Sequence, residues 1–96
     1  MSDLTVQLHI TSIRSRGRTG GAIFSGITES RQSYVAKCDY RLLPDASVIY
    51  KGQIWTITGP VTLRSAFVRS SDLLRHEQVI EATHAELLRP AGRNII

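Results

Sequence analysis

The chain has a single cysteine among its 96 residues, and this scarcity excludes two kinds of structure. One thiol, Cys38, cannot form a disulfide within the chain, and there is no cluster of cysteine and histidine at metal-ligand spacing. Long apolar runs are also missing. None approaches the roughly 20 residues that a helix needs to cross a bilayer, and the amino terminus lacks the basic start and apolar stretch of a signal peptide. The sequence therefore predicts a cytoplasmic protein that contacts no membrane and needs no metal or cofactor.

Catalytic motifs are missing as well. There is no Walker phosphate-binding loop, so no ATPase activity is assigned to this chain. His9, His76 and His84 lie far apart in the sequence, and no acid, base and nucleophile occur in a catalytic arrangement. A chain of 96 residues also has room for one modest core and little for a buried active site with its supporting residues. We therefore expect a single domain, residues 1–96, that is not an enzyme on its own.

Positive charge is in excess, with a formal net charge of +4. The twelve basic residues comprise ten arginines and two lysines. The planar guanidinium group suits phosphate contacts and stacking on bases, which favours a nucleic-acid partner. A solvated surface that happens to be basic is the alternative, because net charge bears on association and not on fold.

Aromatic residues are few, and the only tryptophan marks the expected centre of the core. Trp55 lies in the run 51–61, where apolar and β-branched residues alternate between glycines and Pro60 closes the pattern. Such a run is typical of a buried strand that ends in a turn. A large aromatic inside a short strand is most simply a core residue, so the other strands are expected to wrap around Trp55.

Alternating apolar and polar residues predict four further strands, at 4–14, 22–29, 34–43 and 77–88. The last of these has a helix as its alternative, because glutamate, alanine and leucine favour one on propensity. Residues 65–76 break the alternation and are expected to form a long loop, with one turn of helix begun at Ser71 or Asp72.

Five short strands, with Gly26 allowing a bend in the second, predict an all-β fold in the form of a small, nearly closed antiparallel barrel. The oligonucleotide-binding (OB) fold is the best-known five-stranded barrel of this length, and its ligands usually lie across strands two and three, between two loops. Those loops are the most arginine-rich parts of this chain. The predicted nucleic-acid-binding residues are Arg14, Arg16, Arg18, Phe24, Lys37, Arg41, Arg69 and Arg75.

The third predicted strand has two possible orientations. Tyr34, Cys38 and Tyr40 share one of its faces. The opposite face carries the charges, so we expect these three residues to pack inward and Phe24, Lys37 and Arg41 to face the ligand.

The core strand 52–59, the segment 77–82 leading into Leu88-Arg89-Pro90, and the ending 94–96 give the chain a resemblance to a known family. In this order they resemble the N-terminal OB domain of RecD-like superfamily-one DNA helicases, whose relatives occur in bacterial repair and plasmid-transfer proteins. The resemblance implies an accessory module that contacts single-stranded DNA and other domains of a parent helicase. The abrupt apolar ending, Asn94-Ile95-Ile96, likewise predicts one domain of a longer protein.

Two functions therefore stay open. The first is a single-stranded DNA binding module within a helicase, and the second is a non-catalytic protein-protein interaction barrel. Convergence of the seven basic candidate residues on one face would favour DNA. Scattered arginines together with an apolar surface patch would favour a protein partner.

Overall fold

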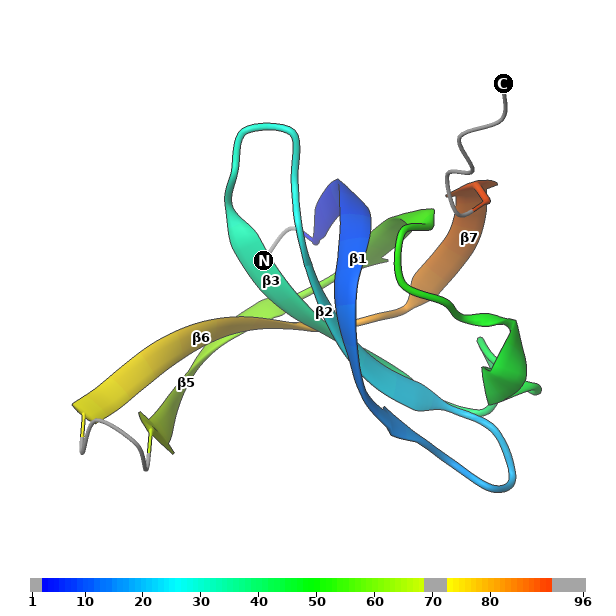
Figure 1. Cartoon of the computed structure of the whole chain (residues 1–96), viewed down its shortest axis with the longest axis horizontal. Coiled ribbons are helices and arrows are strands. Elements are labelled where there is room, and N and C mark those ends of the chain that lie inside the picture. The colour runs from blue at the N-terminus through cyan, green and yellow to red at the C-terminus, as the bar shows by residue number, and fades with distance from the viewer. Residues whose placement is uncertain (1–2, 69–72, 91–96) are drawn as a thin grey trace.

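The computed structural model describes residues 3–68 and 73–90 (Figure 1). The elements described in these ranges are β1 (Leu4–Arg16), β2 (Ala22–Ile27), β3 (Ser33–Cys38), the short 3-10 helix η1 (Ala46–Val48), β4 (Ile54–Gly59), β5 (Val61–Val68), β6 (Leu73–Glu81) and β7 (His84–Arg89). The strands form one sheet in the order β5-β6-β3-β2-β1-β4-β7. Neighbours are antiparallel except β3 and β6, which are parallel. The prediction of an all-β fold is confirmed. No helix in the described ranges is long and apolar enough to cross a membrane.

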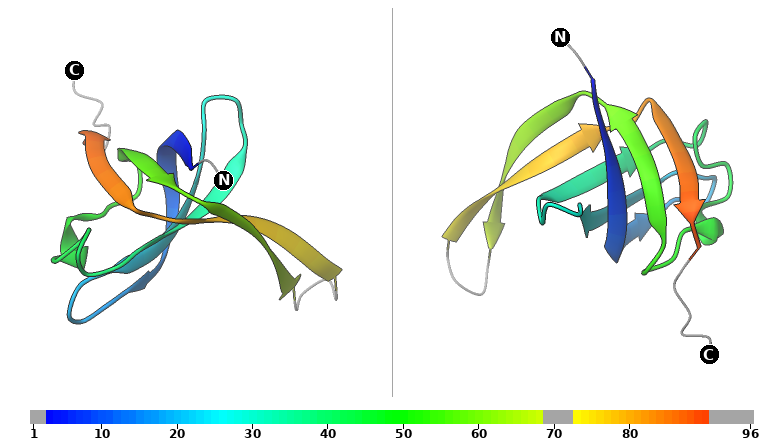
Figure 2. Two further views of the ribbon diagram at one scale, coloured as in Figure 1. Left: turned by 180° about the vertical axis from the view of Figure 1, so that it is seen from behind. Right: turned by 90° about the horizontal axis from the view of Figure 1, so that it is seen from above.

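Strands β4 to β7 form a single long ribbon that is bent in the middle. β5 follows β4 directly after Pro60, and β7 follows β6 after Ala82 and Thr83. β4 pairs with β7 in the near half of the ribbon, and β5 pairs with β6 in the far half. In the half made of β4 and β7, β4 pairs with the edge of β1 that β2 leaves free. In the half made of β5 and β6, β6 pairs with the edge of β3 that β2 leaves free. The ribbon therefore borders the β1–β2–β3 meander on both sides (Figure 2).

The outer part of the far half leaves the body of the molecule. β6 pairs with β3 only at Val79–Glu81, so β5 and residues 73–78 of β6 pair with each other alone. We call this two-stranded projection the arm, and both figures show it extending away from the meander.

The five-stranded barrel is not supported. The sheet has seven strands in the described ranges, is mixed, and ends in two open edges, β5 and β7. The predicted loop at 65–76 is wrong for 65–68 and 73–76, which belong to the two strands of the arm. The helical turn predicted at Ser71 or Asp72 lies outside the described residues. The last predicted strand, 77–88, is confirmed as strand rather than helix, although a turn at Ala82 and Thr83 divides it.

The core is formed by the meander, β4, the segment between β3 and β4, and the end of β6. Its largest fully buried side chains are Phe24, Leu8, Ile49, Ile57 and Ile80. Trp55 is buried in the same cluster, so its predicted core position is confirmed.

Gly26, at which the sequence predicted a bend, lies where the backbones of β1 and β2 approach closely, and the irregularities in their pairing are on β1. A Cβ atom there would lie 2.2 Å from the carbonyl oxygen of His9 on β1. The β1–β2 pairing also shifts register twice, between Ile10 and Ser12 and between Ile13 and Ser15. Irregularities of this kind bend a strand and increase its twist, which lets the meander curl around the core.

Candidate functional site

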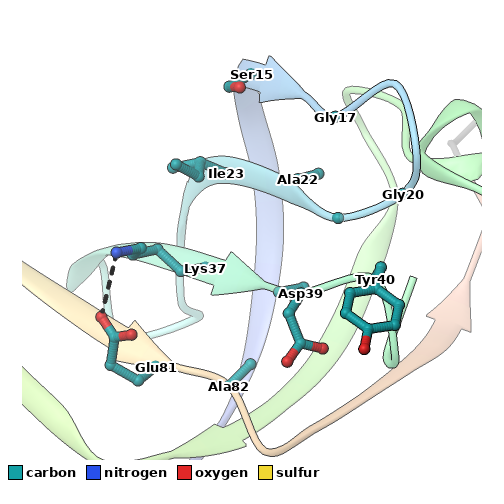
Figure 3. A pocket seen from close by; sticks show the side chains of 12 residues that line it. Ser15, Gly17, Gly20, Ala22, Ile23, Lys37, Asp39, Tyr40, Glu81 and Ala82 are labelled. Atoms are coloured by element: carbon teal, nitrogen blue, oxygen red, sulfur yellow. Dashed lines mark ion pairs between the residues drawn. The ribbon is translucent and has the colours of Figure 1, made fainter. Parts of the chain in front are cut away.

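The face of β2 and β3 that points away from the core carries two hollows. The first, of about 450 Å³, lies between the β1–β2 loop, the end of β3 and the end of β6 (Figure 3). The second, of about 380 Å³, lies farther along the same two strands. This is the part of the sheet at which the sequence predicted a ligand.

Two of the predicted binding residues on this face form ion pairs with glutamates of β6. The Arg14 guanidinium donates to both carboxylate oxygens of Glu77, at 2.7 and 3.1 Å. This hydrogen bonding raises the pKa of Arg14 above its ordinary value. Lys37 Nζ lies 3.7 Å from Glu81 Oε2, as the dashed line in Figure 3 shows. Both pairs join the meander to β6, and the pair of Arg14 with Glu77 is the closer of the two.

Phe24 is not on this face, which corrects its predicted role. Its side chain is 0% exposed, and it lies opposite Ala36 of β3. Residues opposite each other on paired strands share a face. Tyr34 and Cys38 do point inward as predicted, and the same register turns Phe24 inward with them. β2 and β3 therefore present no aromatic ring on their outward face for base stacking.

Cys38 borders the first hollow, but it is buried and belongs to the core cluster. Burial, and to a smaller degree the negative charge of Asp39, raise the pKa of Cys38 to about 12. The thiolate is the nucleophilic form of cysteine. At neutral pH Cys38 is consequently a protonated core thiol and not an activated nucleophile.

The β1–β2 loop and the segment between β3 and β4 are joined into one loop cluster, which we define as residues 16–21 and 39–52. The backbone N–H of Gly21 donates to the carbonyl of Leu43 at 2.8 Å. Arg16 donates from Nε to the carbonyl of Ala46 at 3.2 Å and from its terminal nitrogen to that of Ile49 at 2.7 Å. The Arg16 side chain therefore connects the end of β1 to the segment between β3 and β4.

A glycine with unusual backbone geometry makes this junction possible. Gly20 has φ of +108°, and a Cβ there would lie 2.8 Å from the Leu43 carbonyl oxygen. Only glycine adopts such a conformation without strain. Figure 1 places this cluster at the end of the molecule away from the arm.

The loop cluster exposes two tyrosines, one of which has an arginine beside its ring. Tyr40 is 61% exposed and Tyr50 is 56% exposed. Arg41 bonds Asp39 at 3.0 Å, and its guanidinium carbon lies 5.8 Å from the centre of the Tyr40 ring. The predicted inward orientation of Tyr40 is thus wrong, because β3 ends at Cys38 and the chain turns before it reaches Tyr40.

Asp39 stays ionised in the loop cluster. Desolvation is the largest single effect and raises its pKa, but the hydrogen bonds from the backbone N–H and guanidinium of Arg41 and from the backbone N–H of Leu42 together outweigh it, so the net pKa lies below its ordinary value. The sequence interpretation overlooked Tyr50 and Lys51. The signal that could have found them is a repeated pair, in which Tyr40-Arg41 and Tyr50-Lys51 each place a ring before a cation.

The predicted basic residues do not gather on one face. In the described ranges, Arg14 and Lys37 lie on the sheet face, whereas Arg16, Arg18 and Arg41 lie in the loop cluster. The backbone of Arg75 belongs to the arm, where it is opposite Ala66. Arg69 lies outside the described residues.

Exposed apolar side chains occur along both open edges of the sheet. They are Val61 and Leu63 on β5, and Leu87 and Leu88 on β7. Val61 lies opposite Ile80, and Leu63 lies opposite Gln78. Val61 and Leu63 therefore share the face on which Ile80 is buried. The core-side face of the sheet continues onto the arm, where no described part of the chain covers it.

Compared with protein-family models, curated protein sequences and solved structures, the chain matches none. The resemblance to RecD-like helicase OB domains therefore stays a hypothesis drawn from the sequence.

Proposed function

We propose that this chain is a non-catalytic protein-interaction module and that its contact surface is the core-side face and free edge of the arm. One observation carries the proposal. Along this face, Ile80 is 0% exposed, whereas Leu63 on the arm is 69% exposed. Val61 and Leu63 are exposed apolar side chains that continue the face of the core, and such a continuation is typical of a surface that another chain covers.

Two interactions would stabilise such a complex. Fully burying a leucine side chain is worth about 1.5–3 kcal/mol relative to leaving it in water, so Leu63 alone is a substantial anchor. In addition, β5 pairs only with β6 within the described sheet. The backbone donors and acceptors on its other edge are a template to which a partner strand can add.

The distribution of charge supports a protein partner over DNA on the sheet face. Arg14 and Lys37 are already paired with Glu77 and Glu81, and Phe24 is in the core. Of the predicted contacts on β2 and β3, only the loosely paired Lys37 remains for a phosphate, and no outward ring remains to stack on a base. Under the helicase hypothesis, the strand that adds to the arm belongs to another domain of the parent protein.

The test places a photo-crosslinking amino acid at position 63 and, as a control, at position 30 in the exposed β2–β3 turn. In cells, position 63 should give a discrete protein adduct that position 30 does not. The captured protein, once purified, should bind the wild-type chain, and Leu63→Asp should weaken that binding at least about tenfold. The matched change Ser30→Asp should leave it unaltered. Equal binding by wild type and Leu63→Asp would contradict the proposal.

A further inference from the structure

We propose that the partner of the arm is a second copy of this chain, with the two β5 strands paired antiparallel about a two-fold axis at Ser65. This inference rests on the proposed function of the arm and names the chain that covers it. The free edge of β5 in one copy bonds the same edge in the other, so the two arms become one continuous antiparallel sheet.

The backbone of β5 presents hydrogen-bonding groups to its free edge at alternate residues. The N–H of Glu81 on β6 donates to the carbonyl of Pro60 at 3.0 Å, and from there β5 and β6 pair without a register shift. Along an antiparallel pair, residues that bond each other alternate with residues whose N–H and C=O point away. The even-numbered residues of β5 therefore bond β6, whereas the odd-numbered ones, 61–67, offer their N–H and C=O to a partner strand.

Two conditions select the register between the copies. Opposite residues must both direct their backbone groups at the partner strand, so the two-fold axis passes through a residue. Axes at Arg64 and Ser65 pair the longest part of β5, but an axis at Arg64 sets two arginines directly opposite each other, which is destabilising. An axis at Ser65 pairs residues 62–68 of the two copies and places Leu63 opposite Phe67 of the other copy.

The residues of β5 suit an uncharged, apolar partner strand. Leu63 is 69% exposed in the single chain. Arg64 is the one charged residue in the strand Val61–Val68, and Glu77 of β6 already lies opposite it. A partner strand therefore needs an apolar residue against Leu63 and no acidic residue, and β5 itself meets both conditions. Two-fold symmetry makes each favourable contact twice.

The arm also has room beside it for a second arm. Both ribbon views show it extending away from the meander (Figures 1 and 2). Ser65 lies near the middle of β5, so the bodies of the two copies lie at opposite ends of the paired arms. Pairing of β5 with the other open edge, β7, would instead join copies head to tail, and that arrangement has no reason to stop at two.

Sedimentation velocity of the full chain, over a concentration series, tests for the dimer. The paired edge is short, so we expect a Kd on the order of 10–100 μM. Leu63→Asp should raise this Kd at least about tenfold, and the matched change Ser30→Asp should leave it unaltered. Ser65→Pro removes a donor at the axis that β6 does not use, and it should also weaken the dimer. Trp55 fluorescence checks that each variant is folded.

A disulfide tests the register. Ser65→Cys places two thiols across the axis, with Cα atoms about 5.5 Å apart, which is within disulfide range. Under mild oxidation this variant should form a covalent dimer. Thr62→Cys, whose two copies lie about 20 Å apart, and wild type, whose only thiol Cys38 is buried, should not. Equal disulfide formation in Ser65→Cys and Thr62→Cys would contradict the inference.

Photo-crosslinking from position 63 separates a failure of this inference from a failure of the proposed function. The adduct should have twice the mass of the chain. A chain that stays monomeric at millimolar concentration while position 63 captures a different protein would overturn the second copy and leave the arm as a contact surface. A monomer with no adduct would overturn both. Species that grow beyond the dimer with concentration would also contradict the two-fold pairing.

Discussion

Trp55 donates a hydrogen bond from its indole Nε1 to Oε1 of Gln53 over 2.9 Å, with both side chains buried. The same amide oxygen accepts the backbone N–H of Tyr50, and the amide nitrogen donates to the carbonyl of Val48. One buried amide thus connects the core tryptophan to the loop cluster. Among the described residues, no buried side-chain nitrogen or oxygen lacks a hydrogen-bond partner.

Replacing this amide should be costly. Gln53→Leu leaves the Trp55 indole N–H and the Tyr50 backbone N–H buried without acceptors, so we expect the free energy of unfolding to fall by at least about 2 kcal/mol. Urea denaturation followed by Trp55 fluorescence measures this change. The same substitution at exposed Gln7 should stay within about 0.5 kcal/mol of wild type. Equal effects at the two positions would show that the buried amide contributes nothing specific.

The two ion pairs that tie β6 to the meander should differ in strength because their geometry differs. Arg14 engages both oxygens of Glu77, whereas Lys37 reaches one oxygen of Glu81 at the long distance of 3.7 Å. Double-mutant cycles with alanine should give a coupling energy of about 0.5–1 kcal/mol for the first pair and about 0–0.3 kcal/mol for the second. Salt should weaken the larger coupling. A stronger coupling for Lys37 and Glu81 would refute this ranking.

Cys38 should make the protein less stable at alkaline pH. Its folded-state pKa of about 12 lies above the ordinary value of 9.0, so the unfolded chain loses this proton first. The stabilising contribution is fully present below about pH 9 and is lost as pH rises toward 12, at about 1.4 kcal/mol per pH unit. Urea unfolding of wild type and Cys38→Ala over this range isolates the effect, since other groups titrate alike in both. Parallel pH profiles would argue against a buried thiol.

Gly59 should be intolerant of any side chain, because the two halves of the ribbon meet there. A Cβ at this position would lie 2.2 Å from the carbonyl oxygen of Glu81, which is backbone and cannot move cheaply. Gly59→Ala should lower the free energy of unfolding by about 1–3 kcal/mol and speed amide exchange at Glu81, which bonds Pro60 across the bend. Thr62→Ala on exposed β5 is the control. Unchanged exchange at Glu81 would show that the bend tolerates a methyl group.

The alternation of apolar and polar residues was sufficient to predict the strands that surround the core, such as β1 and β4. The Trp55 strand and the first strand each bury one face, and burial on one face imposes the alternation from which a strand is predicted. The outer part of the arm was not predicted, because a two-stranded ribbon that projects from the sheet does not require apolar and polar residues to alternate. Residues 65–76 therefore read as a loop.

The candidate site was harder to predict than the strands. β2 has apolar residues on both faces, with Ile23 and Ile27 opposed to Phe24, so its own pattern does not show which face is inward. The pairing of Phe24 with Ala36 shows that Phe24 faces the core. This register depends on how two strands pair, so it cannot be read from the pattern of β2 alone. Similarly, no local signal shows that Arg14 reaches Glu77, 63 residues away.

The proposed arm surface is tested most directly by the free energy of unfolding of Leu63→Asp, measured by urea denaturation beside Ile80→Asp. A side chain that serves a partner contributes little to the isolated fold, so Leu63→Asp should lie within about 0.5 kcal/mol of wild type. Ile80→Asp, which buries an unpaired carboxylate, should unfold the chain or destabilise it by several kcal/mol. A loss of about 2 kcal/mol or more in Leu63→Asp would place Leu63 in the core and contradict the arm as a contact surface.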